Sequence, residues 1–408
     1  MDASTRRMMQ EMVSQMTDWV KSLAEDSQKA DSAKSAEALE RRVRQEGQRI
    51  LGTLFQGLLQ NALDHQPPSR TCPRCGRRRR HKGRRTRGLL SSVGAISLSG
   101  VYWYCGDCGG QHALEALADG SASTAVRELL CLLGTSLMSF DKASTASKKL
   151  LGLPVSEAYI RRLCYSEGRR VDIKPAAVEP GQNLVGSCDG TMVNTVQEGW
   201  KELKAYKFWY SGHKHGRAYL ESSDRFTPRL RRAAVAMKAG DAENLLWVSD
   251  AAKWIDKGVS SQLPMAIGII DIWHAWEHVH EASRGVYPDD QDKAHAWARR
   301  YCEDLEDYGG RELWRRLRHA KYSDPDRQAA VAALRTYLLN NAKRLDYPTY
   351  KANGWPISSG PMESFCKQLG QRLKGPGMRW SMQNIDQMAT LVSLWANQEW
   401  DGHWQPAA

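Results

Sequence analysis

The stretch Leu184-Val185-Gly186-Ser187-Cys188-Asp189-Gly190 begins the part of the chain that decides the fold. It is a short apolar run that ends in a carboxylate, as expected of a buried strand followed by a turn. Two later apolar runs have the same form, because residues 244–249 precede Asp250 and residues 266–270 precede Asp271. Three strands that each end at a carboxylate predict an α/β sheet with a site at one end.

Helical patterns follow the last of these runs. The segment from 275 to 350 is rich in Arg, Trp and Leu and predicts an all-helical insertion. Ser358-Ser359-Gly360-Pro361 then precedes a helix that carries Glu363. Helical spacing puts Glu363 on the same side as Lys367 and Lys374, which is also typical of an ordinary i,i+4 ion pair.

The set of Asp189, Asp250 and Glu363 favours metal chemistry. A lone Asp at a strand end is most often a turn former. Three carboxylates in a basic chain need a reason to lie near phosphates, and a divalent metal supplies one. Mg²⁺ takes oxygen ligands from carboxylates and phosphates, and two such ions can activate an attacking oxygen and stabilise the leaving one.

The charge of the 408-residue chain points to a polyanionic partner. Lys and Arg number 58 against 46 Asp and Glu, a formal charge of +12. The excess is local: no acidic residue lies between Asp64 and Asp107, and ten of the 18 residues in 70–87 are Lys or Arg. Nucleic acid is therefore the first partner to consider. The sequence shows no signal peptide, no long apolar run and no regular cysteine framework, so we expect no membrane span and a reducing compartment.

Two Cys-x-x-Cys pairs predict a structural zinc site. Cys72 and Cys75 are separated from Cys105 and Cys108 by 29 residues, and each pair can place two thiolates on one tetrahedral Zn²⁺. Residues 89–104 alternate enough to form short strands, so the segment predicts a zinc ribbon. Four thiolates leave no open position for a substrate. A basic run on a folded loop of this ribbon predicts phosphate contacts through Arg77, Arg78, Arg79, Arg80, Lys82, Arg84 and Arg85.

Helical segments precede and follow the ribbon. Residues 5–62 have apolar positions at three-to-four spacing, and their stripe packs either in a hairpin on its own chain or on a second copy. After the ribbon, residues 140–151, a Gly152-Leu153-Pro154 turn and a helix capped by Ser156 have the proportions of a helix-turn-helix. Any two-helix corner with a glycine looks similar, so this pattern alone leaves DNA reading open. The exposed cations expected on the second helix are Arg161 and Arg162.

Several ordered motifs together resemble the bacterial insertion-sequence transposases, and most closely the ISKra-type family in the Mutator-like group of DDE transposases. The resemblance covers about residues 70 to 400. Its motifs are Cys188-Asp189-Gly190-Thr191, Val248-Ser249-Asp250-Ala251, Asp271-Ile272-Trp273-His274, Met362-Glu363-Ser364 and Gly377-Met378-Arg379-Trp380-Ser381.

The resemblance implies a ribonuclease H-like catalytic fold that a helical insertion interrupts between the second Asp and the Glu. By this likeness Asp189, Asp250 and Glu363 are the metal-binding carboxylates, with two Mg²⁺ or Mn²⁺ ions per active site. Asp271 and His274 match an auxiliary Asp-x-x-His pair. The domains expected are a helical region at 1–68, the zinc ribbon at 69–118, the helix-turn-helix at 119–175, the catalytic core at 176–274 and 351–408, and the insertion at 275–350.

The implied function is DNA transposition. Such an enzyme binds the ends of its element, hydrolyses a phosphodiester to free a 3′-OH and joins that 3′-OH to target DNA. Its partners are double-stranded DNA and further copies of itself, at least a homodimer, since two ends must meet. We expect it in the bacterial cytoplasm at the nucleoid. Further DNA contacts are expected from Lys367, Lys374 and Arg379.

Two other functions fit parts of the sequence. A zinc ribbon with a helix-turn-helix could make a DNA-binding regulator in which the carboxylates are structural. His274-Ala275-Trp276-Glu277-His278 also fits the H-x-x-E-H pattern of zinc peptidases. His213 and His215 are expected to be solvated in a hairpin turn. Five more cysteines are expected to be buried small residues: Cys131, Cys164, Cys188, Cys302 and Cys366.

Overall fold

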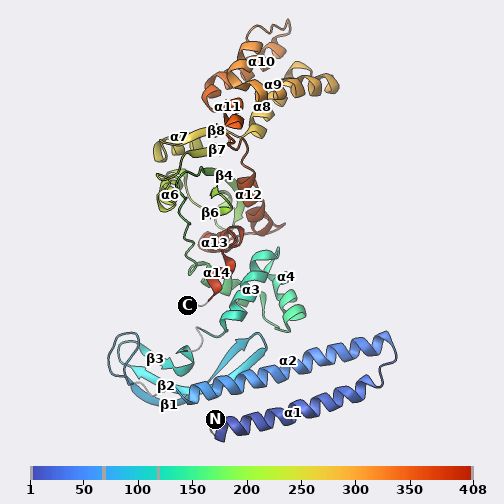
Figure 1. Ribbon diagram of the computed structural model, residues 1–408, viewed down its shortest axis with the longest axis vertical. Helices are drawn as coiled ribbons and strands as arrows, with labels where there is room; N and C mark the ends of the chain where they lie inside the picture. Colours follow the sequence, from blue (N-terminus) through green and yellow to red (C-terminus); the bar gives the residue numbers. More distant parts are fainter. Residues whose placement is uncertain (1–2, 67–69, 117–119, 406–408) are drawn as a thin grey trace. The chain divides into compact units, whose positions relative to one another are not determined.

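The computed structural model describes residues 3–66, 70–116 and 120–405, and the chain divides into two units (Figure 1). One unit contains the described residues up to Cys164, and the other contains Tyr165–Gln405. The domain boundaries predicted after residues 68 and 118 lie outside the described residues. Among the described helices, none is both long and apolar enough to cross a membrane.

The first unit begins with a helical hairpin of α1 (Ala3–Ser27) and α2 (Ala33–Asp64). Arg42 of α2 forms an ion pair with Asp26 of α1, which helps to hold the two helices together. The apolar stripe of α1 is only partly covered, because residues such as Val13 stay exposed. The hairpin on its own chain is therefore observed, and packing on a second copy stays a prediction.

A three-stranded antiparallel sheet follows in the order β1-β2-β3, and it packs against α2. Its strands are β1 (Arg80–Ser91), β2 (Gly94–Cys105) and β3 (Gly109–His112). A small core of Leu63, Leu89, Ile96, Leu98 and Leu114 joins the sheet to α2. Strands are present within residues 89–104 as predicted, but the first of them begins earlier than predicted, at Arg80. The basic run continues onto β1 instead of staying in a loop, because β1 and β2 pair along almost their whole length.

Three helices come next, α3 (Thr124–Ser136), α4 (Phe140–Ala146) and α5 (Glu157–Gly168). One turn of π-helix extends α4, and Gly152 ends it in the left-handed conformation with φ +66°. The Ser156 hydroxyl accepts a hydrogen bond from the backbone N–H three residues later, at the start of α5. The predicted helix, turn and second helix are thus present where the sequence places them.

The second unit is built on a mixed five-stranded sheet in the order β6-β5-β4-β7-β8. β6, β5 and β4 are antiparallel neighbours, whereas β4, β7 and β8 run parallel. The strands are β4 (Leu184–Thr195), β5 (Gly199–Tyr210), β6 (His213–Tyr219), β7 (Leu245–Ser249) and β8 (Ile267–Ile270). The predicted α/β sheet is confirmed.

Helices cover both faces of this sheet. On one face α6 (Ser223–Ala236) and α7 (Lys253–Gln262) pack over alternate residues of β4 such as Leu184 and Cys188. On the other face Val185 belongs to a separate core with residues of β7 and β8. Since side chains of a strand alternate between faces, Asp189 lies on the same face as Val185.

The predicted insertion is helical throughout, as expected. It consists of α8 (Ile272–Val286), α9 (Gln291–Leu317), α10 (Pro325–Asn341), a short 3₁₀ turn (Ala342–Arg344) and α11 (Tyr347–Ala352). Its buried side chains share one core with the Val185 face of the sheet. The chain then returns to the sheet as α12 (Gly360–Leu373), which packs on β4 and β5, and ends in α13 (Ile385–Ala396) and α14 (Trp400–Trp404).

One sequence prediction about the strands is wrong. β4 does not end at Asp189, because it continues to Thr195 as one arm of a long hairpin with β5. Its parallel pairing with β7 covers only residues 184–186. Asp189 is therefore a mid-strand residue, whereas Asp250 and Asp271 do follow the ends of β7 and β8 as predicted.

Candidate active site and cysteine metal centre

The strand register brings Asp189 and Asp250 to the same level of the sheet. The parallel pairing of β4 and β7 joins Leu184 to Leu245 and continues residue by residue to Gly186 and Trp247. Carried three residues further, the same register places Asp189 beside Asp250. The register of β7 and β8 likewise leads from Ser249 and Ile270 to Asp250 and Asp271.

The charges around Asp189 agree with this register. Burial raises the pKa of Asp189, the hydrogen bond from the Gly190 N–H lowers it, and the nearby charge of Asp250 raises it. The Gly190 N–H donates to Asp189 Oδ1 at 2.6 Å. Asp189 also interacts with the Cys366 thiol and with the charge of His274, both of which lower its pKa. Residues from β4, β7, α8 and α12 therefore meet at one place.

Glu363 lies in the first turn of α12 and is exposed. Its carboxylate accepts from Lys367 Nζ at 3.4 Å, so the i,i+4 ion pair is formed. One turn further, Cys366 points to Asp189, and burial together with the Asp189 charge raises the pKa of the Cys366 thiol well above its usual range. The Cys366 thiol is thus acted on by the charges of both Asp189 and Glu363, while Glu363 itself lies on the solvent side of the helix.

Asp271 is buried, with 2% of its surface exposed, and both of its carboxylate oxygens accept hydrogen bonds. Oδ1 accepts from the Trp273 N–H at 2.8 Å and so caps the start of α8. Oδ2 accepts from the N–H and the hydroxyl of Ser359, both at 2.6 Å, just before α12. Asp271 therefore acts as a positioning residue that ties α8 to α12.

We expect Asp271→Ala to lower the free energy of unfolding by about 3 kcal/mol, because buried donors lose a charged acceptor. Ser359→Ala removes only the hydroxyl bond and should cost about 1 kcal/mol. Urea denaturation of both variants measures the two effects. Equal stability of Asp271→Ala and the unaltered chain would show that this residue does not connect the two helices.

His274 and His278 both lie on α8 but do not share a carboxylate. His274 Nδ1 is 3.1 Å from Glu277, and His278 Nδ1 is 3.6 Å from Glu281. Burial lowers the pKa of His274, but the Glu277 hydrogen bond and the acidic charges around it outweigh burial and raise the pKa. In the described structure these residues form no group of three close ligands, so the geometry gives the peptidase pattern no support.

The cysteine pairs do meet. The sulfur atoms of Cys72, Cys75, Cys105 and Cys108 all lie within 4.8 Å of one another, the one group of three or more close metal-ligating atoms among the described residues. Asp189, Asp250 and Glu363 do not form a group this tight. All four cysteines have free thiols. The arrangement is compatible with a structural zinc site.

The backbone turns sharply after each cysteine pair, at a glycine. Each pair is followed by a glycine with positive φ, Gly76 at +73° and Gly109 at +77°, where a side chain would cause strain. Burial raises the pKa of Cys72, but hydrogen bonds from backbone N–H groups and from Gln111 outweigh it and bring the pKa to about 6. The neighbouring cysteines raise the pKa of Cys75 and Cys108, so zinc, which binds the thiolate form, would displace protons there.

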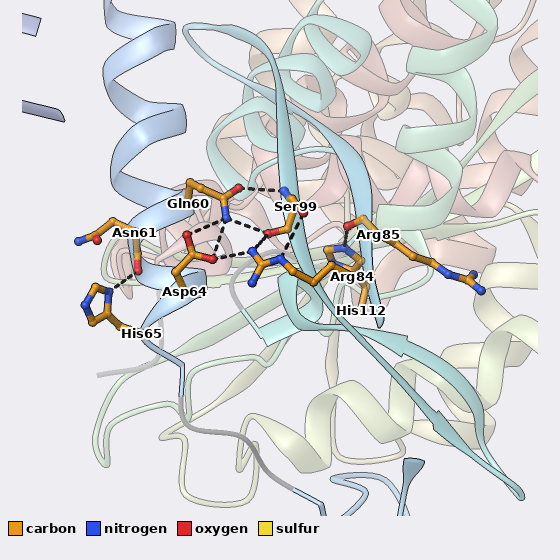
Figure 2. Close-up of polar contacts among 8 residues, drawn as sticks. All are labelled: Gln60, Asn61, Asp64, His65, Arg84, Arg85, Ser99 and His112. Carbon is orange, nitrogen blue, oxygen red and sulfur yellow. Dashed lines mark hydrogen bonds and ion pairs between the residues drawn. The ribbon is translucent and has the colours of Figure 1, made fainter. Parts of the chain in front are cut away.

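Figure 2 shows a polar network that ties α2 to the ribbon. Arg84 Nη2 donates to Asp64 at 2.5 Å and to the Ser99 carbonyl at 2.7 Å. The Gln60 amide accepts from the Ser99 N–H and donates to the Ser99 carbonyl, both at 2.8 Å. Arg84 was predicted to contact DNA, and in the structure it holds the helix to the sheet.

The other predicted DNA contacts lie mostly on exposed surfaces. Arg79 is half-buried, because it donates to Gln111 at 2.9 Å and lies over the Trp103 ring at 4.9 Å. A hollow of about 1100 Å³ beside it is lined by cations and by Trp103, which suits a phosphate backbone. The predicted DNA-contacting residues whose side chains are exposed are Arg77, Arg78, Arg80, Lys82, Arg85, Arg161, Arg162, Lys367, Lys374 and Arg379.

Sequence reasoning missed the contacts of Cys366 and Lys207 near the site and, on the opposite face of the sheet, the burial of His215. Cys366 was taken as a buried small residue, although its position three after Glu363 signals the same helical face. Lys207 of β5 is buried beside the Phe365 ring, and burial lowers its pKa to about 8. His215 is not solvated as predicted, because it is buried on β6 and bonded to the Tyr206 hydroxyl at 3.2 Å.

Comparison with known proteins adds no relative: no family profile matches the chain, and no curated protein matches it significantly.

Proposed function

We propose that this protein is a DNA transposase that cuts the ends of an insertion sequence and joins the freed 3′-OH to target DNA. The observation that carries the proposal is the pairing of β4 with β7, which leads Asp189 toward the charge of Asp250, with α12, the helix that bears Glu363, packed against the same strand. We further propose that residues 176–274 and 351–408 form a ribonuclease H-like catalytic core. A mixed sheet and a helical insertion between Asp250 and Glu363 support that assignment.

Asp189, Asp250 and Glu363 are the residues that would hold Mg²⁺ or Mn²⁺, two ions per active site. They offer only oxygen donors, which these ions prefer. The charge of Asp250 raises the pKa of Asp189, and a cation between them would relieve this repulsion. Bound metal supplies a Lewis acid that activates the attacking oxygen and stabilises the leaving one.

The chain's own residues would bind and orient the DNA around this centre. The Glu277 hydrogen bond and the acidic charges around His274 outweigh its burial and raise its pKa, which favours the protonated imidazole at this place. Lys367, Lys374 and Arg379 are exposed on and after α12 and would contact phosphates. Asp271 would keep α8 and α12 in register, because it bonds to the start of both.

The first unit would supply most of the DNA affinity. Its exposed arginines on β1 and α5 suit phosphate contacts, and a zinc ion in the cysteine centre would hold the ribbon together. A transposase must bring two element ends together, so we propose a dimer or larger homo-oligomer at the bacterial nucleoid.

The proposal predicts cleavage of the DNA that flanks the gene. Labelled duplexes carrying the flanking inverted repeats should be nicked at the repeat ends with Mg²⁺ or Mn²⁺ and joined to added plasmid. Gel separation of the products measures both steps. Binding without cleavage would instead indicate a DNA-binding regulator, and digestion of casein that stops on zinc chelation would indicate a peptidase.

A further inference from the structure

A cation-rich hollow lies between α7 and the helical insertion, and we call it the edge hollow. Its volume is about 650 Å³, and its lining comes from α7, the ends of α9 and α10 and the 3₁₀ turn that follows α10. Asp256 is the only acid among the described residues that line it. Its cations are Arg311, Arg315, Lys343 and Arg344.

The protein itself holds Arg344 in place. Arg344 forms an ion pair with Asp256 and donates to Asn341 Oδ1 at 2.5 Å. Its side chain lies against Gly268, where an added Cβ would come within 3.2 Å of Arg344 Cδ. Gly268 belongs to β8, the edge strand of the five-stranded sheet. The edge hollow therefore lies at this edge of the sheet, and its one acid is already paired.

Two other cations of the edge hollow have no acidic partner. In the part of the chain that the structure describes, neither Arg311 nor Lys343 has a side-chain hydrogen bond or ion pair, and both are exposed. Arg315 differs, because it pairs with Glu312 at 3.1 Å. Two unpaired cations that line one hollow repel each other, and a bound anion would relieve this repulsion.

The uncharged lining suits a sugar-phosphate backbone better than a small inorganic anion. Ser260 and Asn340 provide a hydroxyl and an amide, which can donate to phosphate oxygens as the cations do. Trp314 and Leu339 add apolar surface, and Leu339 is 58% exposed. Apolar surface beside phosphate-binding groups can contact a deoxyribose.

The edge hollow reaches toward the candidate active site. A smaller hollow of about 340 Å³ shares the two cations of the 3₁₀ turn and continues to Ser249, the residue before Asp250. The charges of Arg344 and Asp250 both act on the Tyr337 hydroxyl, so the cation and the carboxylate lie around the same side chain. A DNA strand cut at Asp250 would therefore have neighbouring phosphates within reach of the edge hollow.

We propose that the edge hollow binds the DNA backbone next to the cleaved phosphodiester, with Arg311 and Lys343 as its two phosphate contacts. This inference rests on the proposed function and gives the helical insertion a part in it. The insertion holds the strand while the carboxylates cut it. Contacts to phosphates carry no base information, so this site reads no sequence.

Salt dependence of binding tests the two contacts. The affinity of the full-length chain for a repeat-end duplex is measured at several salt concentrations without divalent metal, so that no DNA is cut. Arg311→Gln/Lys343→Gln should lower the affinity by about 10-fold at physiological salt. The slope of log K against log salt should fall by about 2, because each phosphate contact contributes about 0.9.

Neutral phosphates in the DNA locate the contacts. Duplexes carry one methylphosphonate at successive positions around the repeat end. A methylphosphonate one or a few positions from the cut should weaken binding by the unaltered chain. The same duplex should cost Arg311→Gln/Lys343→Gln nothing further, because the contact is already lost.

Arg300→Gln/Lys321→Gln is the matched control. Both residues are exposed in the insertion and lie outside the edge hollow, so the change in net charge is the same. This variant should keep the methylphosphonate profile and the salt slope of the unaltered chain. Circular dichroism and thermal unfolding check that both double variants are folded.

Three results would overturn the inference. Equal loss of affinity in both double variants would reduce the effect to net charge. A methylphosphonate profile that Arg311→Gln/Lys343→Gln leaves unchanged would place the contacts elsewhere. Binding of inorganic tripolyphosphate that this variant loses while its DNA affinity stays normal would assign the edge hollow to a free polyphosphate.

Failure of the proposed function gives a different result. The unaltered chain would then cut none of the duplexes when Mg²⁺ or Mn²⁺ is added. Failure of this inference alone would leave cleavage by the unaltered chain in place and remove only the contrast between the two double variants.

Discussion

Asp189→Asn and Asp250→Asn should each slow DNA cleavage by about 10³-fold while leaving affinity for the same DNA nearly unchanged. A loss of this size corresponds to about 4 kcal/mol of transition-state stabilisation. Asn keeps the size and one oxygen of Asp, so the Gly190 N–H and the Ala252 N–H keep their acceptors. What changes is the negative charge that would hold a divalent metal. Labelled element ends report the rate, and filter binding reports the affinity.

Asp224→Asn provides the matched control. Asp224 lies in the first turn of α6 in the same unit and is exposed, so its substitution changes net charge equally but leaves the carboxylate cluster intact. It should cleave DNA at the rate of the unaltered chain. An Asp189→Asn protein that still cuts and joins DNA would refute the role given to this carboxylate.

Asp189→Asn should also change the free energy of unfolding in a pH-dependent way. Burial and the Asp250 charge raise the pKa of Asp189 in the folded state, so folding disfavours its charged form. Asp189→Asn should therefore be more stable than the unaltered chain at pH 7. The difference should shrink as pH falls and vanish below 3.8, the ordinary pKa of Asp, since the carboxyl is then protonated in both states. Urea denaturation at several pH values measures this trend.

Loss of the cysteine centre should unfold the ribbon of the first unit and weaken DNA binding. The ribbon's own apolar core is small, and structural zinc in isolated finger peptides contributes about 10 to 16 kcal/mol. Cys105→Ser, or removal of zinc by a chelator, should therefore unfold β1–β3 and lower DNA affinity by at least about 10-fold, because the basic side chains of β1 lose their common surface. Amide hydrogen exchange reports the strands, and elemental analysis reports the zinc.

Cys302→Ala is the control for this experiment. Cys302 is buried in the second unit, in the core of the insertion, and has no part in the cysteine centre. It should retain one zinc per chain and normal DNA affinity. A purified chain that carries no zinc and still protects the amides of β1 and β2 would contradict the assignment.

Local patterns in the sequence predicted much of the fold. Three apolar runs became strands, the Arg- and Trp-rich segment became a helical insertion, and Ser156 caps a helix as expected. These features depend on residues close together in the chain. The continuation of β4 past Asp189 escaped prediction, because Gly190 to Thr195 looks polar and its strand character comes from pairing with β5.

The sequence by itself determined the chemistry available to this protein: four cysteines at metal-ligand spacing, carboxylates after apolar runs, and a basic stretch without acids. Only the tertiary structure decided how these groups are used. The pairing of β4 with β7 brings Asp189 within reach of the Asp250 charge, Asp271 bonds to Ser359 across 88 positions, and Arg84 forms an ion pair with Asp64. Such contacts depend on strand register and helix packing over long sequence distances, and no local periodicity specifies either.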